Sequence, residues 1–385
     1  MDLKRALEQL LTALDDKKGS DLFITVGWPP SIKINGAIYP AAKQPLTAEQ
    51  VRGMVYEIMN ERQRAEFEDT KECQFAVDRS PLGRFRVSAF VQRDSAGMIL
   101  RRIESRIPTL EELKLPSVLR DLGMSKRGLV IFVGATGTGK STSLAALIGH
   151  RNRKSNGHII TIEDPIEFVH EHDGCIITQR EVGVDTESFE VALRNTLRQA
   201  PDVILIGEVR TRATMEYAIN FAETGHLVLA TLHANNANQA LDRVINFFPE
   251  ESRNQVLLDL SLNLKAIVAQ QLIPRKNGQE RRAVIEVLIN TPLAADLIRK
   301  GEITKLKELM KNSGEQGMIT FDQALFNLYA EGEISHDDAI RFADSANEVR
   351  LAIKLQGGEA QRIATGRAID AITLVPEEDR KKSER

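Results

Sequence analysis

The sequence of 385 residues has few cysteines, few tyrosines and tryptophans, and almost no net charge. Its two cysteines, Cys73 and Cys175, lie far apart and form neither a metal-ligand spacing nor a disulfide framework, which indicates a reducing compartment. With one tryptophan, four tyrosines and a formal net charge of -3, the chain lacks the basic, aromatic-rich surface typical of a nucleic-acid binder. We therefore expect no nucleic-acid partner.

Long apolar runs are also absent. No run of the sequence reaches the ~18 apolar residues that a membrane-spanning helix needs. Residues 1–16 mix leucines with Asp2, Lys4, Arg5 and Glu8, which predicts an amphipathic helix rather than a signal peptide. We therefore expect a cytoplasmic protein without direct membrane insertion.

Residues 1–103 predict a small α+β domain. The segments with strand-like patterns are Asp21–Val26, Ser31–Ile34, Gln74–Asp78, Arg84–Phe90 and Met98–Ile103. The dipeptide Asn35-Gly36 supplies a tight hairpin turn, because both residue types tolerate a positive φ. Thr47, with Gln50 three residues later, predicts a capping box at the start of a helix that runs to about Met59.

The middle of the chain predicts a nucleotide-binding core. Residues 104–116 contain Pro108 and Pro116, which predict a linker. Beyond it, nearly continuous apolar runs come between helical segments, the pattern of a parallel sheet that is covered on both faces. These runs are Leu129–Val133, Ile159–Ile162, Val203–Ile206 and Leu227–Thr231. We expect residues 117–290 to form this α/β core.

The remainder of the chain is predicted to be mostly helical. Asn254–Leu272 has the pattern of one long amphipathic helix, and Phe321–Tyr329 and His336–Ser345 have that of shorter helices. We expect a helical carboxy-terminal region at residues 291–355. A charged tail follows at residues 356–385, and its densely charged end predicts disorder.

The strongest motif is the string GATGTGKS at residues 134–141, which matches the phosphate-loop pattern G-x-x-x-x-G-K-[ST]. It follows a predicted strand and precedes a predicted helix, so backbone N–H groups and the helix dipole can bind phosphate. Lys140 is expected to reach the β- and γ-phosphates, and Ser141 to bind Mg²⁺. The predicted nucleotide-binding residues are Gly134, Ala135, Thr136, Gly137, Thr138, Gly139, Lys140, Ser141 and Thr142.

Two of the predicted strands are followed by acidic residues. Ligands of open α/β sheets bind at the carboxyl ends of strands, so Glu163 and Asp164 are candidates to orient the attacking water. An Asp-Pro pair also starts turns, and the spacing alone does not decide between these two interpretations. Glu208 follows another strand in a Walker B pattern, in which the carboxylate holds Mg²⁺ through water. A solvated acid at a strand end would give the same pattern.

One histidine and four arginines complete the set of candidates. His233 follows the strand Leu227–Thr231 and is predicted to contact the γ-phosphate, although a lone histidine is more often structural. Arg194 and Arg198 share a face of a predicted helix at Phe189–Ala200. The other two, on strands of the first domain, are Arg86 and Arg101. Solvent-facing charges on strands would explain Arg86 and Arg101, but a ring ATPase needs arginines that stabilise transition-state charge, often from another domain or subunit.

Together these motifs resemble the secretion ATPase superfamily and, more narrowly, the PilT/PilU pilus-retraction ATPases. The matching segments are GATGTGKST (134–142), TIEDPIE (161–167), LRNTLRQAPDVILIGEVR (193–210) and GHLVLATLHANNA (225–237). In that family they are called Walker A, Asp box, Walker B and His box. The first domain matches at SDL (20–22), GRFRVSAF (83–90) and RRI (101–103). The resemblance covers roughly residues 1–355.

The resemblance implies an α/β fold class, with a PAS-like α+β amino-terminal domain, a RecA-like P-loop NTPase domain and a helical carboxy-terminal part. It implies a homo-hexamer that binds ATP and Mg²⁺ between subunits and powers pilus retraction and twitching motility. The implied partner is an inner-membrane pilus platform protein, which places the chain peripheral to the inner membrane at the pilus base. The residues that match the family's catalytic set are Glu163, Glu208, His233, Arg86, Arg101, Arg194 and Arg198.

One segment departs from the family pattern. PilT proteins carry an Ala-Ile-Arg-Asn-Leu-Ile-Arg-Glu segment needed for retraction, and the nearest counterpart here, Ala295–Gly301, matches only in part. With the longer charged tail, the chain looks more like the accessory PilU branch, which implies a second PilT-like retraction ATPase as a partner. One alternative is an accessory nucleotide-binding ring component with little hydrolysis of its own. A nucleic-acid ATPase is another, against which the charge balance and the few aromatics argue.

Overall fold

The computed structural model describes residues 2–34, 36–103, 106–278 and 280–355. The chain divides into two compact units. The first consists of the described residues through Phe132, together with Lys140–Leu232 and Val244–Lys265. The second consists of Val133–Gly139, His233–Arg243 and the described residues from Ala266 onward.

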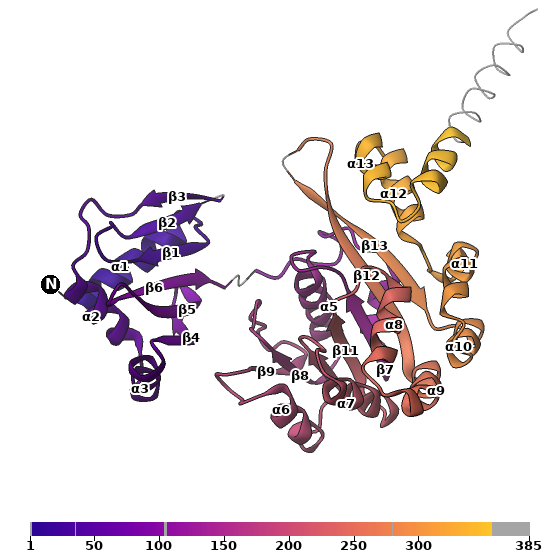
Figure 1. Cartoon of the computed structure of the whole chain (residues 1–385), viewed down its shortest axis with the longest axis horizontal. Coiled ribbons are helices and arrows are strands. Elements are labelled where there is room, and N and C mark those ends of the chain that lie inside the picture. Colours follow the sequence, from indigo (N-terminus) through magenta and orange to yellow (C-terminus); the bar gives the residue numbers. More distant parts are fainter. Residues whose placement is uncertain (1, 35, 104–105, 279, 356–385) are drawn as a thin grey trace, which may run out of the picture. The chain divides into compact units, whose positions relative to one another are not determined.

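The amino-terminal part of the first unit is a six-stranded antiparallel sheet, in the order β3-β2-β1-β6-β5-β4 (Figure 1). Its strands are β1 Asp21–Ile24, β2 Ser31–Ile34, β3 Ala37–Pro40, β4 Glu72–Arg79, β5 Gly83–Gln92 and β6 Ser95–Arg102. The five predicted strands are confirmed, whereas the exposed edge strand β3 was not predicted. Asn35, part of the predicted turn, lies outside the described residues.

Three helices accompany this sheet, namely α1 Leu3–Asp16, α2 Ala48–Ile58 and α3 Glu61–Thr70. In α1, Leu7, Leu11 and Leu14 are buried, which is the i, i+4, i+7 stripe of an amphipathic helix. The predicted capping box of α2 is confirmed, since Thr47 and Gln50 exchange both side chain–backbone hydrogen bonds. The helix α3 was not predicted, although it begins with a second capping box of the same kind.

The second sheet has seven strands in the order β13-β12-β7-β11-β10-β8-β9. The bounds are β7 Gly128–Val133, β8 Gly157–Glu163, β9 Cys175–Glu181, β10 Val203–Ile206, β11 Leu227–Leu232, β12 Leu264–Pro274 and β13 Arg281–Ile289. The strands β9, β8, β10 and β11 pair in parallel. The four predicted parallel-type strands correspond to β7, β8, β10 and β11, and every residue of β7, β10 and β11 is buried.

The long helix predicted at Asn254–Leu272 is wrong. The helix α9 spans Arg253–Asn263, and the chain then continues as the strand β12. Ala266 to Pro274 pair antiparallel with β13, and most of β12 is buried. Apolar residues at these positions fit a helix or a strand. The choice is made by backbone pairing with β13, a segment farther along the chain that a local pattern does not reveal.

Helices connect and flank the strands of the second sheet (Figure 1). They are α4 Val118–Gly123, α5 Lys140–Lys154, α6 Phe189–Thr196, α7 Arg212–Glu223 and α8 Ala237–Asn246. The helix predicted at Phe189–Ala200 ends as α6 at Thr196 and continues as a 3₁₀ turn, Leu197–Gln199. Ala200 then adopts φ +50° before Pro201. A proline disfavours the α-helical conformation of the residue that precedes it, so the helix ends here.

The carboxy-terminal described residues form α10 Pro292–Arg299, α11 Leu306–Lys311, α12 Phe321–Ala330 and α13 His336–Arg341. Glu286 of β13 is buried and accepts hydrogen bonds from the backbone N–H groups of Ala237 (2.9 Å) and Phe321 (3.3 Å). Its carboxylate thereby caps the amino-terminal ends of α8 and α12. Burial raises the pKa of Glu286 to about 7.

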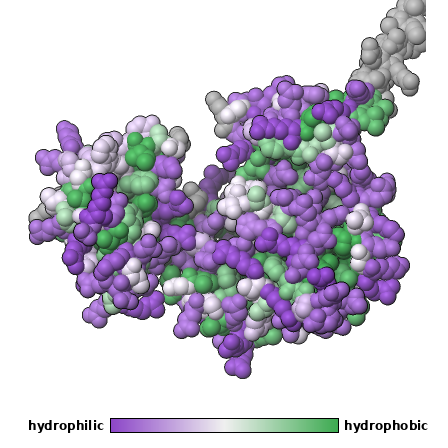
Figure 2. Space-filling model, viewed as in Figure 1, coloured by the Kyte–Doolittle hydropathy of each residue, from purple (hydrophilic) through white to green (hydrophobic). Residues whose placement is uncertain are grey.

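Across the described residues, no helix has both the length and the apolar character needed to cross a bilayer. The face shown in Figure 2 is largely hydrophilic, with small apolar areas between polar ones. The charged tail predicted at residues 356–385 lies outside the described residues.

Candidate functional site

The predicted phosphate loop connects the buried strand β7 to the helix α5, which begins at Lys140. Gly134 and Gly139 adopt φ values of +154° and +85°, a conformation that side chains strongly disfavour. The Thr138 hydroxyl donates to the carbonyl of Ala135 at 2.9 Å. The loop therefore has the compact form in which backbone N–H groups can converge on a phosphate.

Gln270 of β12 supports this loop from within the second unit. Its Nε2 donates to the carbonyl oxygen of Thr138 at 2.8 Å. A Cβ at Gly134 would lie 2.5 Å from the carbonyl oxygen of Gln270, and one at Gly139 would lie 2.8 Å from its Nε2. Close packing against backbone therefore requires glycine at position 134, and the backbone conformation favours glycine at both positions. Gln270 was missed in the sequence because its segment was predicted to be helical.

We predict that Gln270→Leu weakens ATP binding by about tenfold, because the phosphate loop loses the hydrogen bond that holds the Thr138 carbonyl in place before ATP binds. The Thr138 carbonyl also loses its donor, which costs about 1–3 kcal/mol of folding stability. The thermal midpoint should therefore lie below that of the wild type, although leucine has nearly the volume of glutamine. Gln271→Leu, which alters the opposite face of the same strand, is the matched control. Titration with a fluorescent ATP analogue measures the affinities, and equal values for both variants would contradict the role of Gln270.

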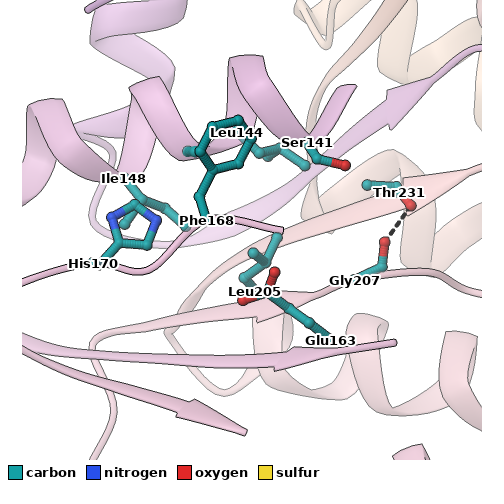
Figure 3. A pocket seen from close by; sticks show the side chains of 10 residues that line it. Ser141, Leu144, Ile148, Glu163, Phe168, His170, Leu205, Gly207 and Thr231 are labelled. Carbon is teal, nitrogen blue, oxygen red and sulfur yellow. Dashed lines mark hydrogen bonds between the residues drawn. The ribbon is translucent and has the colours of Figure 1, made fainter. Parts of the chain in front are cut away.

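A small cavity in the first unit brings together residues from several strand ends (Figure 3). Ser141 from α5, Glu163 from β8, Gly207 after β10 and Thr231 from β11 line it, with apolar residues of α5 on one side. Its volume of about 30 Å³ is enough for one or two water molecules. The Thr231 hydroxyl donates to the carbonyl of Gly207, which links β11 to the segment after β10.

Glu163 is the titratable acid that lines this cavity. Burial raises the pKa of its carboxyl to about 7, although hydrogen bonds from Thr161 and Gln179 oppose that rise. Oε1 accepts from the Thr161 hydroxyl at 2.7 Å and from Gln179 Nε2 at 3.1 Å. A carboxyl that titrates near neutral pH beside a water-sized space has the properties of a general base.

Lys140 and Glu208 lie close enough to influence each other. Burial lowers the pKa of Lys140, whereas the negative charges of Glu208 and Glu167 act in the opposite direction. Glu208 also pairs with Arg210, whose Nε and Nη2 lie 2.8 and 2.7 Å from Oε2. Arg210 Nη1 lies 3.5 Å from Asp164 Oδ2, so this arginine connects the Walker B and Asp-box segments. Arg210 was not among the predicted site residues, although it lies only two positions after Glu208.

The residues present fit the Mg²⁺ that the phosphate-loop motif implies. Mg²⁺ prefers oxygen ligands and usually combines one or two protein groups with phosphates and water. Ser141 lines the cavity from the first turn of α5 and carries a hydroxyl oxygen (Figure 3). The carboxylate of Glu208 lies near enough to act on Lys140, the preceding residue. A hydroxyl and a carboxylate thus flank the start of α5.

Three other predicted site residues, His233, Arg194 and Arg198, are not among the residues that line the cavity. His233 directly follows β11 and is half-buried in the second unit. Arg194 is exposed on α6, and Arg198 is exposed on the 3₁₀ turn that follows. The two arginines therefore do not share one regular α-helix, contrary to the sequence prediction.

Arg86 and Arg101 are direct neighbours in the amino-terminal sheet, where they pair across β5 and β6. Arg101 Nε forms a 2.7 Å ion pair with Asp21, whose side chain is buried. The Ser20 hydroxyl donates to the same carboxylate at 2.7 Å. Since most of the Arg101 side chain remains exposed, part of its guanidinium can still bind another group.

Comparison with known proteins identifies the family. Residues 84–311 match the model of the family described as Type II/IV secretion system protein. The Pseudomonas aeruginosa protein named Type IV pilus ATPase PilU is 68% identical over 90% of this chain and 91% of its own length. The chain belongs to this family. It is a PilT/PilU-type pilus ATPase, as the motifs predicted.

Two further comparisons agree. The P. aeruginosa protein named Type IV pilus retractation ATPase PilT is 42% identical, over 86% of this chain and 96% of its own length. The solved structure of the pilus retraction motor PilT with bound ADP has a TM-score of 0.83 and 36% identity, and covers 90% of this chain and 98% of that one. The α/β fold class, with an amino-terminal domain and a RecA-like ATPase domain, and the ATPase activity are therefore confirmed.

Proposed function

We propose that this pilus ATPase hydrolyses ATP with Mg²⁺ as a ring-forming motor that powers type IV pilus retraction. The observation that carries the chemistry is the water-sized cavity in which Glu163 meets the first turn of α5. The names of the relatives, which refer to the type IV pilus and its retraction, support the biological role.

The residues divide the reaction among them. Lys140 and the backbone N–H groups of residues 134–142 bind the phosphates. A water oxygen bonds to the γ-phosphorus, the bond to the bridging oxygen of ADP breaks, and Glu163 takes the proton of the water. His233 contacts the γ-phosphate from the end of β11. Ser141 and Glu208 would hold Mg²⁺, which would supply positive charge to neutralise the phosphate oxygens.

The four arginines supply positive charge to the phosphates, from another domain or from another subunit. Arg194 and Arg198 are exposed, and Arg101 is largely exposed. Exposed guanidinium groups suit a site that is completed only when subunits assemble into a closed ring, here a homo-hexamer. The motor would work at the inner-membrane pilus base, through a pilus platform protein and alongside a second PilT-like ATPase.

Assembly dependence tests this proposal. We expect ATP hydrolysis per subunit to rise cooperatively with protein concentration, because each site needs groups from two subunits. Mixing Lys140→Ala with an arginine variant should restore activity at up to about a quarter of the interfaces, if that arginine acts between subunits. A rate per subunit that stays flat with concentration would contradict the ring mechanism.

A second candidate is an accessory ring component that supports a partner ATPase and hydrolyses little ATP itself. The partial match of Ala295–Gly301, carried by α10 and the residue pair after it, favours it. Retraction measured in cells that express Lys140→Ala beside an intact partner separates the two. Normal retraction favours the accessory role, and its loss favours the motor.

A further inference from the structure

The side chain of Gln179 connects Glu163 to the segment that closes the cavity. Gln179 lies on β9 directly opposite Thr161 of β8. Its Nε2 donates to Glu163 Oε1 at 3.1 Å and to the carbonyl of Phe168 at 2.9 Å. Its Oε1 accepts from the backbone N–H of His170 at 2.7 Å. Phe168 and His170 both line the cavity with Glu163 (Figure 3).

These three bonds determine the orientation of the Gln179 amide. The N–H of His170 is a donor, so the amide oxygen must face it. The amide nitrogen then faces two acceptors, a carboxylate and a carbonyl, and uses both of its hydrogens. The flipped amide would place its oxygen against those two acceptors and its nitrogen against a donor. Glutamine is therefore matched to this position by both its donors and its acceptor.

The two donors to Glu163 select one of its oxygens. Thr161 and Gln179 both bind Oε1, and over the described residues no hydrogen bond reaches Oε2. Rotation of the carboxyl group is therefore restricted, and Oε2 remains as the oxygen that can accept a proton.

Negative charges near Glu163 disfavour its ionised form, so the two hydrogen-bond donors are needed to stabilise the carboxylate. Glu167 and Glu181 both raise the pKa of Glu163, in addition to its burial. His170 supplies no compensating charge, because burial lowers its pKa to about 4. Thr161 and Gln179 are the groups that favour the ionised carboxylate.

We propose that Gln179 is a positioning residue for ATP hydrolysis, which directs Oε2 of Glu163 to the attacking water and holds the Phe168–His170 segment against the same cavity. This inference rests on the proposed role of Glu163 as the base. In this mechanism Gln179 contacts neither the attacking water nor the nucleotide, and it acts only through Glu163 and the Phe168–His170 segment.

The chain offers a matched control for a purely structural role. Thr178, the preceding residue of β9, has its hydroxyl 2.8 Å from Nε2 of His158 on β8. This bond joins the same two strands, but on the opposite face of the sheet, since successive side chains of a strand alternate. Thr178→Val therefore removes a bond between β8 and β9 without touching Glu163. Gln179→Leu removes one such bond, to Glu163, together with the two bonds to Phe168 and His170.

The test compares both variants with the wild type in the full-length protein. For Gln179→Leu we expect kcat at pH 7 to fall about 10- to 100-fold, with the KM for ATP changed less than about threefold. Because Glu163 loses a donor, its pKa rises, so the acid limb of the pH–kcat profile should move to higher pH and part of the rate should return near pH 9. Thr161→Val should move the profile in the same direction, and Thr178→Val should follow the wild type.

Two results would overturn the proposal. One is a wild-type profile for Gln179→Leu. The other is a fall in kcat that is the same at every pH, occurs also in Thr178→Val and is accompanied by a lower thermal midpoint. That result would indicate a structural role. Glu163→Gln separates this failure from failure of the proposed base. If Glu163→Gln is inactive while Gln179→Leu is normal, only the positioning role falls, whereas an active Glu163→Gln removes both.

Discussion

Glu163→Gln should lower kcat for ATP hydrolysis by about 10²–10⁴-fold, the usual contribution of a positioned general base. Glutamine has nearly the same shape and can still accept from Thr161 and Gln179 through its carbonyl oxygen. It cannot accept a proton from water. Nucleotide affinity should therefore stay near the wild-type value, which equilibrium titration with ATP measures. A variant that keeps more than about a tenth of the wild-type kcat would exclude Glu163 as the base.

The raised pKa of Glu163 also predicts how the rate of ATP hydrolysis depends on pH. Since the carboxyl titrates at about 7, the wild-type rate should rise as pH increases through about 7. The residual rate of Glu163→Gln should show no such rise, because the titrating group has been removed. A pH–kcat profile between pH 6 and 9 checks both statements.

Stability should change in the opposite sense to activity. The pKa of Glu163 in the folded protein, about 7, lies above its ordinary value of 4.5, so the folded state loses stability as pH rises between these values. Above pH 7 the folded protein bears the cost of a buried charge. Glu163→Gln avoids that cost, so its thermal midpoint should exceed that of the wild type at pH 8 and approach it near pH 5. Thermal unfolding at the two pH values measures the difference.

Lys140→Ala should remove detectable ATP hydrolysis and weaken ATP binding by about 10²-fold or more, because the lysine supplies the positive charge for the β- and γ-phosphates. Burial lowers the pKa of Lys140, so its replacement by alanine also removes a desolvation cost and should not lower the thermal midpoint of the nucleotide-free protein.

Lys154→Ala is the matched control, since Lys154 is exposed in the last turn of the same helix. It should leave ATP hydrolysis and ATP affinity close to the wild-type values. Hydrolysis by purified Lys140→Ala at more than about a hundredth of the wild-type rate would contradict the assigned role.

The sequence alone determined those parts of the molecule whose causes are local. The phosphate loop needs a strand, glycines and a helix start within one short segment, so its pattern was sufficient. The strands β7, β8, β10 and β11 contain nearly continuous apolar runs, which indicates strands buried on both faces. The capping box of α2 lies within four residues. The positions of Glu163, Glu208 and His233 at or just beyond the carboxyl ends of three of these strands followed directly.

Only the tertiary structure decided what depends on pairing between distant segments. The residues after Asn263 form a strand because β13 pairs with them, and that strand carries Gln270 to the phosphate loop. Gln179 reaches Glu163 because β9 is in register with β8. The physical reason is the same in both cases. A hydrogen bond between strands depends on register and on strand order, which a local pattern of apolar and polar residues does not contain.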